Sequence, residues 1–488
     1  MKKYFYLNIL LALIIVLELN YLATEHNFRF DFTPDKRYTL SEASVDLVSS
    51  LDQPLNITVY ISSDVMPEFA IFAREVKSVL EDYRLASGGK IFFSVTDPLK
   101  SDRALAKANA DGVKPFIVDV YDKDQVKSTK AYSSVVFKYN GRTEKIDYLE
   151  PSQSLEYMFS SAIEKLIYPG KPVIGILQGD NLPPFSKYKA FINSLDAYKV
   201  EPVYYDSLPL SSDKYSVIAL IAPKKKLPAK TFEFLDKYLA SGGRVFVALN
   251  TVEGKIDANP PVGNALNTGV DKWLENFGLK VNTNFIIDAV CGQIPVIQSN
   301  PAYRTKVDFP YFPVITNFAK HPVTTGLNAV VMSFASSIDI KQTKNIKATS
   351  IAFSGEHSGI VKPPVVFNFF RQWKKSDFPL SHLPVGVALE GDDWKMLVFS
   401  DGDFLQLPAG EQYENSDNIY LAVNSIDWLA DKSGLIEVRT KGAEYKPIKD
   451  LGRKEKVFVK YLNLLLPIIF VLLIGLFVVV KNRKKRSL

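Results

Sequence analysis

The residues with the clearest capacity for chemistry are Asp401 and Asp403, which follow a short apolar run at 396–399. Such a run is typical of a central strand, and open α/β sheets bind ligands at the carboxyl ends of their strands. Two carboxylates there could bind a cation or act as an acid–base pair. Carboxylates in this position also cap helices or hydrogen-bond their own loop. Asp401 and Asp403 are therefore weak candidates for a ligand site.

Thiol and imidazole chemistry have less support. Cys291 is the single cysteine, which excludes an intrachain disulfide framework, a CxxC redox pair and a cysteine-rich zinc site. No base lies near it in the sequence, and we expect a buried, inert thiol. His26, His321, His357 and His382 are scattered without metal-ligand spacing, and His321, which precedes a proline, is expected in a turn.

Sites for nucleotides and for acyl transfer are also missing. No Walker A lysine loop and no GxGxxG motif follows any predicted strand, so we do not expect an ATPase. In class I amidotransferases and DJ-1-like enzymes a cysteine stands in a strand-to-helix turn. The matching turn here, 223–226, reads Pro-Lys-Lys-Lys and is expected to be a solvated loop. The sequence therefore predicts no catalytic residue, no cofactor, no bound metal and no enzyme activity.

The charge of the chain is concentrated at its ends. The 488 residues, 47% hydrophobic and 23% charged, are enough for two or three globular domains. The net charge is +6, but residues 2–3 and 481–486 carry seven cations, so residues 4–480 have a net charge of −1. A nucleic-acid-binding protein would place basic charge on its folded body. We therefore expect no nucleic-acid partner.

Two apolar segments predict membrane helices. Residues 461–480 contain no charge, and the basic tail at 481–488 that follows indicates a cytoplasmic C-terminus. Residues 1–23 form a less regular N-terminal anchor, because Asn8, Glu18 and Asn20 interrupt its apolar run. A cleaved signal peptide is the alternative, although no small-x-small cleavage site follows the run. Glu18 would either snorkel to the lipid headgroups or pair with a membrane helix of a partner subunit.

These segments predict a protein that crosses the lipid bilayer twice, with both termini in the cytoplasm and the body outside. A bacterial inner-membrane protein with a periplasmic body fits this arrangement, and a lone cysteine is compatible with an oxidising compartment. The expected order is the anchor at 1–23, two domains at 24–170 and 171–443, a tether at 444–460, and the second membrane helix at 461–480.

The first domain, 24–170, is expected to be thioredoxin-like. Strands are predicted at 57–62, 90–95, 116–121, 133–139 and 142–146, with helices at 69–85, 102–110 and 154–168. This β-α-β-α-β-β-α order resembles the thioredoxin fold, and Pro115 precedes the predicted third strand, where that fold usually has a cis-proline. The turn at 62–67 holds no cysteine, so redox catalysis is not expected.

The second domain, 171–443, is expected to be a doubly wound α/β domain, flavodoxin-like or amidotransferase-like. Strands are predicted at 173–179, 200–205, 217–222, 244–249 and 396–399, with helices at 188–198, 229–240 and 418–429. Residues 255–390 are rich in Asn, Pro, Thr and Ser. We interpret them as insertions or an antiparallel edge, with short β-like runs at 331–335 and 365–369.

Five segments in order resemble one family. They are RYTLS at 37–41, LDKYLASGGRV at 235–245, HPVTTGL at 321–327, VFSDGDF at 398–404, and the helix at 418–429 that precedes the C-terminal membrane segment. Together they resemble the GldG-type, gliding-motility-associated auxiliary subunits of ABC transporters, and the wider family of ABC-transporter auxiliary proteins. The resemblance covers nearly the whole chain.

The resemblance implies a non-catalytic envelope subunit that works with a separate membrane permease and a separate cytoplasmic ATPase. The alternative is a membrane-tethered hydrolase or ligand-binding enzyme that uses Asp401 and Asp403. A third possibility is a solute-binding protein with its pocket between the two α/β units.

Overall fold

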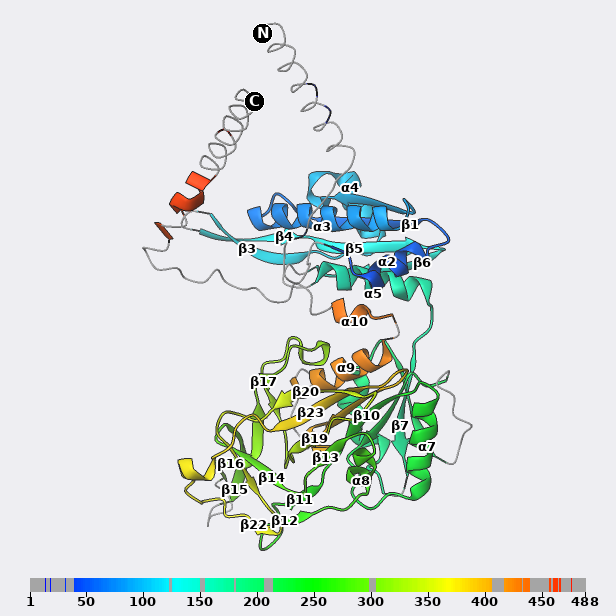
Figure 1. Cartoon of the computed structure of the whole chain (residues 1–488). Coiled ribbons are helices and arrows are strands. Elements are labelled where there is room, and N and C mark those ends of the chain that lie inside the picture. The colour runs from blue at the N-terminus through cyan, green and yellow to red at the C-terminus, as the bar shows by residue number, and fades with distance from the viewer. Residues whose placement is uncertain are drawn as a thin grey trace, which may run out of the picture. The chain divides into compact units, whose positions relative to one another are not determined.

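A computed structural model describes residues 39–122, 125–149, 154–179, 181–205, 214–297, 304–405, 417–431 and 433–438, with a few isolated positions elsewhere (Figure 1). The chain is a mixed α/β protein. Residues up to Ala443 form one compact unit and Glu444–Leu488 a second.

The N-terminal sheet has four strands in the order β2-β1-β5-β6. Strand β1 is parallel to β2 and antiparallel to β5, which is antiparallel to β6. Their bounds are β1 Leu55–Ile61, β2 Ile91–Thr96, β5 Ser133–Tyr139 and β6 Arg142–Ile146, and the helices are α2 Glu42–Ser49, α3 Pro67–Ala86, α4 Asp102–Ala110 and α5 Leu155–Ile167. Short 3-10 turns occur here at Pro98–Lys100 and in the second sheet's region at Phe185–Tyr188, Pro322–Thr324, Lys375–Asp377 and Asp403–Leu405.

The helices of this part follow the sequence closely. Helix α3 buries Phe69, Phe72, Val76, Leu80 and Tyr83, which recur at helical spacing, against the sheet. Helix α5 begins after Ser154, whose hydroxyl accepts the backbone N–H of Tyr157, as an N-cap residue does. The sequence does not predict helix α2, because its short amphipathic pattern lies next to the weakly patterned residues that precede it.

The strand predicted at 116–121 is present, but it is not the third strand of the sheet as expected. Strand β3 Phe116–Asp122 pairs with β4 Gln125–Ala131 in a separate hairpin, and the sequence does not predict β4. The third strand of the sheet is β5, which follows Tyr132. Pro115 therefore does not precede a central strand, and the cis prolines of the described residues are Pro260 and Pro364.

The second sheet has eight strands in the order β17-β20-β23-β24-β10-β9-β7-β8. Strands β8, β7, β9, β10 and β24 are mutually parallel, and their chain order across the sheet is 2-1-3-4-5, as in one common class of doubly wound sheets. The parallel strands are β7 Val173–Gln178, β8 Lys199–Tyr204, β9 Val217–Ile221, β10 Arg244–Ala248 and β24 Lys395–Phe399. The antiparallel edge consists of β23 Pro384–Glu390, β20 Lys347–Phe353 and β17 Asn317–Phe318.

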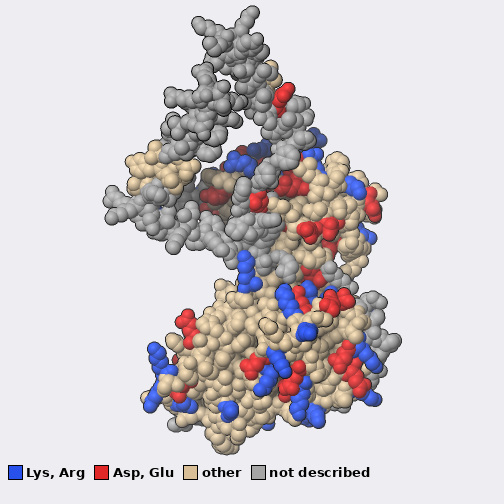
Figure 2. All heavy atoms as spheres, in the orientation of Figure 1, with Lys and Arg blue, Asp and Glu red and all other residues tan. Residues whose placement is uncertain are grey.

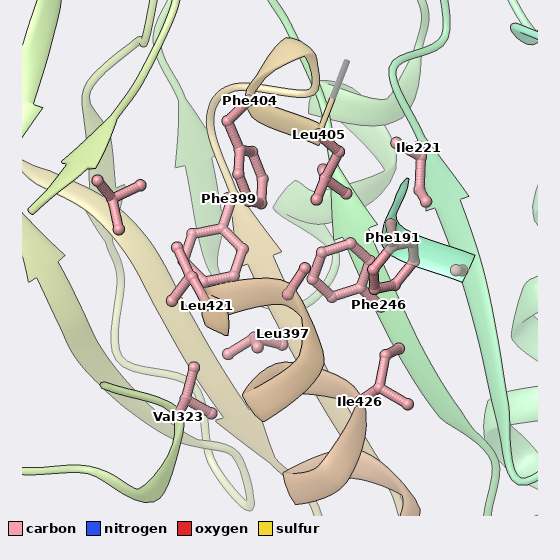
Figure 3. Close-up of a cluster of buried hydrophobic side chains, with 14 of the residues drawn as sticks. Phe191, Ile221, Phe246, Val323, Leu397, Phe399, Phe404, Leu405, Leu421 and Ile426 are labelled. Atoms are coloured by element: carbon pink, nitrogen blue, oxygen red, sulfur yellow. The ribbon is translucent and has the colours of Figure 1, made fainter. Parts of the chain in front are cut away.

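Both faces of this sheet are covered, which explains the unbroken apolar runs. In β9, Val217, Ala219 and Ile221 face one core and Ile218 and Leu220 face the other. Helices α6 Lys189–Asn193 and α9 Asp417–Ala430 pack on the first face (Figure 3), and α7 Ala229–Ala240 and α8 Val270–Glu275 on the second. Helix α7 matches its predicted bounds. The helix predicted at 188–198 is only five residues long, because Asn193 and Ser194 are poor helix formers and the chain must return to β8.

The segment predicted as insertions forms small antiparallel sheets beside the antiparallel edge. They contain β11 Val252–Lys255, β12 Val262–Ala265 and β22 Val365–Val366; β13 Leu279–Val281 and β19 Ile338–Ile340; β14 Phe285–Asp288 and β21 Ser358–Val361; and β15 Cys291–Ile297, β16 Arg304–Ile315 and β18 Val330–Val331. An aromatic cluster that includes Phe285, Phe309 and Phe334 fills their centre. The β-like runs predicted at 331–335 and 365–369 are strands only in their first one or two residues.

The predicted membrane helices fall almost entirely outside the described residues, as do Arg37, Tyr38, most of the tether and the basic tail. Among the residues that the structure does describe, no helix combines the length and the apolar character needed to cross a bilayer.

Candidate functional site

The ends of three neighbouring parallel strands meet where the sequence predicts a ligand site. Strand β24 lies beside β10, and β10 lies beside β9. Asp401 follows β24, Asn250 follows β10, and Lys224 follows β9, so one edge of the sheet brings these three side chains together. The structure therefore places Asp401 and Asp403 at the edge that the sequence predicts.

The Asp401 carboxylate is fully buried and engaged on both oxygens. Its Oδ1 accepts the backbone N–H of Asp403 at 2.7 Å and the side-chain amide of Asn250 at 3.2 Å. Its Oδ2 accepts the backbone N–H of Ser333 at 2.6 Å. A buried carboxylate with three donors directed at it has little capacity left for an outside ligand.

Asn250 and Gly402 hold the same strand ends close together, in what we call the Asp401 corner. The Asn250 side-chain oxygen accepts the Gly402 N–H at 3.0 Å, so Asn250 contacts both Asp401 and the residue after it. A Cβ on Gly402 would lie 2.6 Å from the Cα of Ala222 and 2.8 Å from the carbonyl oxygen of Ala248. Only glycine allows this close approach of the β24 loop to the neighbouring strand ends. Ala222 itself has a positive φ of 46°.

Asp403 is occupied by a lysine. The Lys224 ammonium lies 2.6 Å and 2.8 Å from the two carboxylate oxygens of Asp403, and both side chains are partly exposed. Lys224 belongs to the basic turn that the sequence predicts as a solvated loop. The structure instead shows that Lys224 neutralises the second of the two candidate carboxylates.

Burial, with a smaller contribution from the nearby Asp403 charge, raises the pKa of Asp401 to about 7, although its hydrogen bonds act in the opposite direction. Burial is also the main reason that the pKa of Tyr188 is raised, with the charge of Asp403 adding to it. The Tyr188 hydroxyl donates to the carbonyl of Ile221 at the end of β9. Asp401 is thus buried and internally hydrogen-bonded, whereas the Asp403–Lys224 pair beside it is partly exposed.

The same corner anchors the inserted segment. Ser333, which donates to Asp401, precedes Phe334, whose φ is 63°, and Ser336 then donates its N–H to the carbonyl of Ser400 at 3.2 Å. No local pattern points to Ser333 or Asn250, because their partners are distant in the chain. A polar residue directly after the apolar run predicted as a strand at 244–249 is the only hint of Asn250.

The other residues considered for chemistry lie apart. Cys291 begins β15, half-buried, and burial with the charges of Asp308 and Asp288 raises its pKa to about 11, which disfavours a reactive thiolate. His321 precedes a 3-10 turn, as the sequence predicts, and its Nδ1 accepts the N–H of Val323 at 3.2 Å. No group of three or more metal-ligating side chains occurs in the part of the chain that the structure describes.

Comparisons with known proteins agree with a transport-associated role. A family model described as an ABC-type uncharacterized transport system matches residues 171–425, and a domain of unknown function matches residues 34–138. An uncharacterized protein of Borreliella burgdorferi is 24% identical over 413 residues, which cover 82% of this chain and 77% of that protein.

Two solved structures resemble part of the chain. The mmIFT52 N-terminal domain has 16% identity and a TM-score of 0.37, with 53% of this chain and 96% of that one covered. PurLQS from Thermotoga maritima has 10% identity and a TM-score of 0.27, with 53% and 100% covered. The family model spans more than half of the 488 residues. The chain therefore belongs to the family of ABC-type transport-system auxiliary components.

Proposed function

We propose that the protein is a non-catalytic auxiliary subunit of an ABC transporter complex, anchored in the bacterial inner membrane with its body in the periplasm. The observation that carries the proposal is the state of Asp401. At the sheet edge where α/β enzymes place reacting groups, this carboxylate is buried and its oxygens are bonded to Ser333, Asp403 and Asn250. Its role is to hold strand ends and the inserted segment together.

The two apolar segments at 4–23 and 461–480 support anchoring at both ends. The basic residues at 481–486 favour a cytoplasmic C-terminus, and two crossings return the N-terminus to the same side. The folded residues between the two segments are then outside the cytoplasm.

Partners follow from the missing nucleotide motif. Since no Walker A loop and no GxGxxG motif follows a predicted strand, the proposal assigns ATP hydrolysis to a separate cytoplasmic ATPase. A membrane permease would connect this ATPase to the anchors, and its conformational cycle would bias how the periplasmic body is held. The gliding-motility-associated GldG type is the specific assignment that we propose, on the ordered segments between residues 37 and 429.

The N-terminal part is, in this proposal, a thioredoxin-like domain without redox activity. The strand order β2-β1-β5-β6, with only the pair β1 and β2 parallel, supports this assignment. The turn after β1, residues 62–66, contains no thiol. We infer that this domain is a binding module.

A tethered hydrolase or ligand-binding enzyme that uses Asp401 and Asp403 is the second candidate. The raised pKa of Asp401, about 7, favours it, because a general acid needs a proton near neutral pH. Asp403→Asn discriminates the two, since it removes the second carboxylate at a partly exposed position. An enzyme would lose its activity with this change, whereas an auxiliary subunit would keep its transport function.

The proposal is tested by purification of the full-length protein from its native membranes in mild detergent. A multi-span permease and a soluble ATPase at fixed ratios to this chain are expected. Recovery of the chain alone would contradict the proposal.

A further inference from the structure

A hollow of about 340 Å³ opens beside strand β21 in the inserted segment, and its lining contains none of the residues that bond to Asp401 or Asp403. Its walls are partly apolar, from Ile287, Ile360 and Leu380, and partly polar, from Arg371 and Asp377. Ile360 and Leu380 each leave 38% of their surface exposed. The hollow therefore joins apolar contact surface to hydrogen-bonding groups.

The backbone of β21 is only partly paired on the edge that points away from β14. The Ala289 N–H donates to the carbonyl of His357 at 3.0 Å. In an antiparallel ladder, the backbone N–H and C=O of successive residues point alternately toward and away from the partner strand. The backbone groups of Ser358 and Ile360 therefore point away from β14. Ser358 exchanges two hydrogen bonds with Leu380, at 2.7 Å and 2.8 Å. Ile360, two residues further along, presents its N–H and C=O on the same side.

The chain itself does not continue that pairing. An antiparallel strand in register with the Ser358–Leu380 pair would place Phe378 opposite Ile360. The Phe378 N–H instead donates to the carbonyl of Lys375 at 3.2 Å, within the 3-10 turn Lys375–Asp377. Within the described part of the chain, the Ile360 N–H and C=O therefore have no partner. The neighbouring Ser358–Leu380 pair shows the register that an added antiparallel strand would take.

The polar wall is fixed in place. The Arg371 guanidinium lies 4.1 Å from the centre of the Trp373 ring and 2.8 Å from Asp377. Such paired contacts reduce the freedom of a long side chain and preorganise it for a ligand.

The surroundings of the hollow carry an excess of basic residues. Residues 356–377 contain four cations, Lys362, Arg371, Lys374 and Lys375, and two carboxylates, Glu356 and Asp377, of which Asp377 pairs with Arg371. Arg371, Lys374 and Lys375 are exposed. In Figure 2, Lys and Arg side chains lie among Asp and Glu side chains over the surface of this domain.

We propose that this hollow binds an extended acidic peptide segment of a partner, which adds to β21 as an antiparallel strand. The Ile360 N–H and C=O pair with the peptide backbone, and an apolar side chain of the peptide enters the hollow between Ile360 and Leu380. Acidic residues of the peptide, which point to the other face of the added strand, are attracted to the exposed lysines around the hollow. Strand addition of this kind obtains affinity from main-chain hydrogen bonds and specificity from pockets for alternate side chains.

The test uses the full-length protein in detergent micelles and a fluorescent nonapeptide of alternating Asp and Val, with binding followed by anisotropy. Two control peptides accompany it, one with Lys in place of Asp and one N-methylated at alternate residues, which lacks donors on one edge. We expect the Asp–Val peptide to bind with a salt-dependent affinity and both controls to bind at least about tenfold more weakly.

Three protein variants complete the test. Ile360→Pro removes the outward N–H without interrupting the β14 pairing, because proline is tolerated on an edge strand, and should weaken binding about tenfold or more. Ile360→Val keeps the N–H and should bind as the wild type does. Lys374→Glu combined with Lys375→Glu changes only exposed charges and should weaken binding and flatten its salt dependence.

The proposal is overturned if the Asp–Val peptide fails to bind, if the Lys–Val peptide binds equally well, or if Ile360→Pro binds as Ile360→Val does. If Ile360→Pro does not fold, the variant with Lys374→Glu and Lys375→Glu tests the proposal, which is overturned if this variant binds the Asp–Val peptide as tightly as the wild type does.

Discussion

Asn250 Nδ2 donates to Asp401 Oδ1 at 3.2 Å, although the two residues are 151 positions apart in the chain. They follow two adjacent strands of the sheet, β10 and β24. The same asparagine accepts the N–H of Gly402 at 3.0 Å. The two residues thus join the end of β10 to the loop after β24. This corner stands where an α/β enzyme would place its substrate.

Asp401→Asn should destabilise the fold. An amide in place of the carboxylate keeps one acceptor oxygen and directs its NH₂ group at a buried donor, so the free energy of unfolding should fall by about 2 kcal/mol. Urea unfolding of the full-length protein in detergent measures this. Asp403→Asn is the matched control and should change the value by less than about 1 kcal/mol, because its ion pair with Lys224 is partly exposed. Equal effects of the two substitutions would contradict a structural role specific to Asp401.

Gly402→Ala should cost several kcal/mol, roughly 2–4, because the new Cβ would meet the backbone of Ala222 and Ala248 rather than a movable side chain. Gly179→Ala is the control at the end of β7. Its Cβ would lie 3.8 Å from Tyr205, an ordinary contact. A thermal unfolding midpoint for Gly402→Ala as high as that for Gly179→Ala would show that the strand ends are not packed as described.

His321 should make the fold sensitive to acid. Burial lowers its pKa to about 4, from an ordinary value of 6.5, and its ring lies 5.1 Å from that of Trp428. The folded state keeps this imidazole neutral, whereas the unfolded chain protonates it first. The stability from His321 is therefore present above pH 6.5 and is lost as the pH falls toward 4.

His321→Asn isolates this effect, since asparagine can still accept the Val323 N–H but does not titrate. We expect the wild type to lose more stability between about pH 7 and about pH 5 than the variant does, by urea unfolding at both values. Asp401 works in the opposite direction, because its raised pKa favours the folded state as the pH falls from about 7 to about 4. Both proteins contain Asp401, so the comparison cancels its contribution. An identical acid dependence in the two would contradict a buried, neutral His321.

The membrane topology is open to a direct test. Single cysteines placed near residues 2 and 486, in a Cys291→Ser background, should be protected from a membrane-impermeant thiol reagent in spheroplasts whose inner membrane is intact. A cysteine at exposed Lys374 should react. A reactive N-terminal position, or its removal by processing, would favour the signal-peptide alternative.

Much of the fold follows from local sequence. Helix α7 has its predicted bounds because its apolar residues recur at helical spacing and Ser241-Gly242-Gly243 ends it. The apolar runs of β9 and β10 predict strands covered on both faces, and two cores lie there. What the pattern could not predict is the pairing of β3 with β4, since a largely polar strand such as β4, with the sequence QVKSTKA, carries no regular apolar alternation.

The candidate site is only partly predictable. The position of Asp401 after an apolar strand indicates the correct edge, but not its burial. Burial depends on Asn250 and Ser333, which approach from other strands and leave no short-range pattern. The pairing of Lys224 with Asp403 similarly requires the sheet order, in which β9 and β24 flank β10.

The central claim is that the chain works as a subunit with a permease and an ATPase, and copurification from native membranes tests it most directly. The full-length protein should bring down a multi-span membrane protein and a soluble ATPase in fixed ratios, as measured by mass spectrometry of the complex in mild detergent. The Asp403→Asn variant should recover the same set, while a variant truncated before residue 461 should lose the permease. Recovery of the full-length chain alone, under conditions that preserve other membrane complexes, would contradict the account.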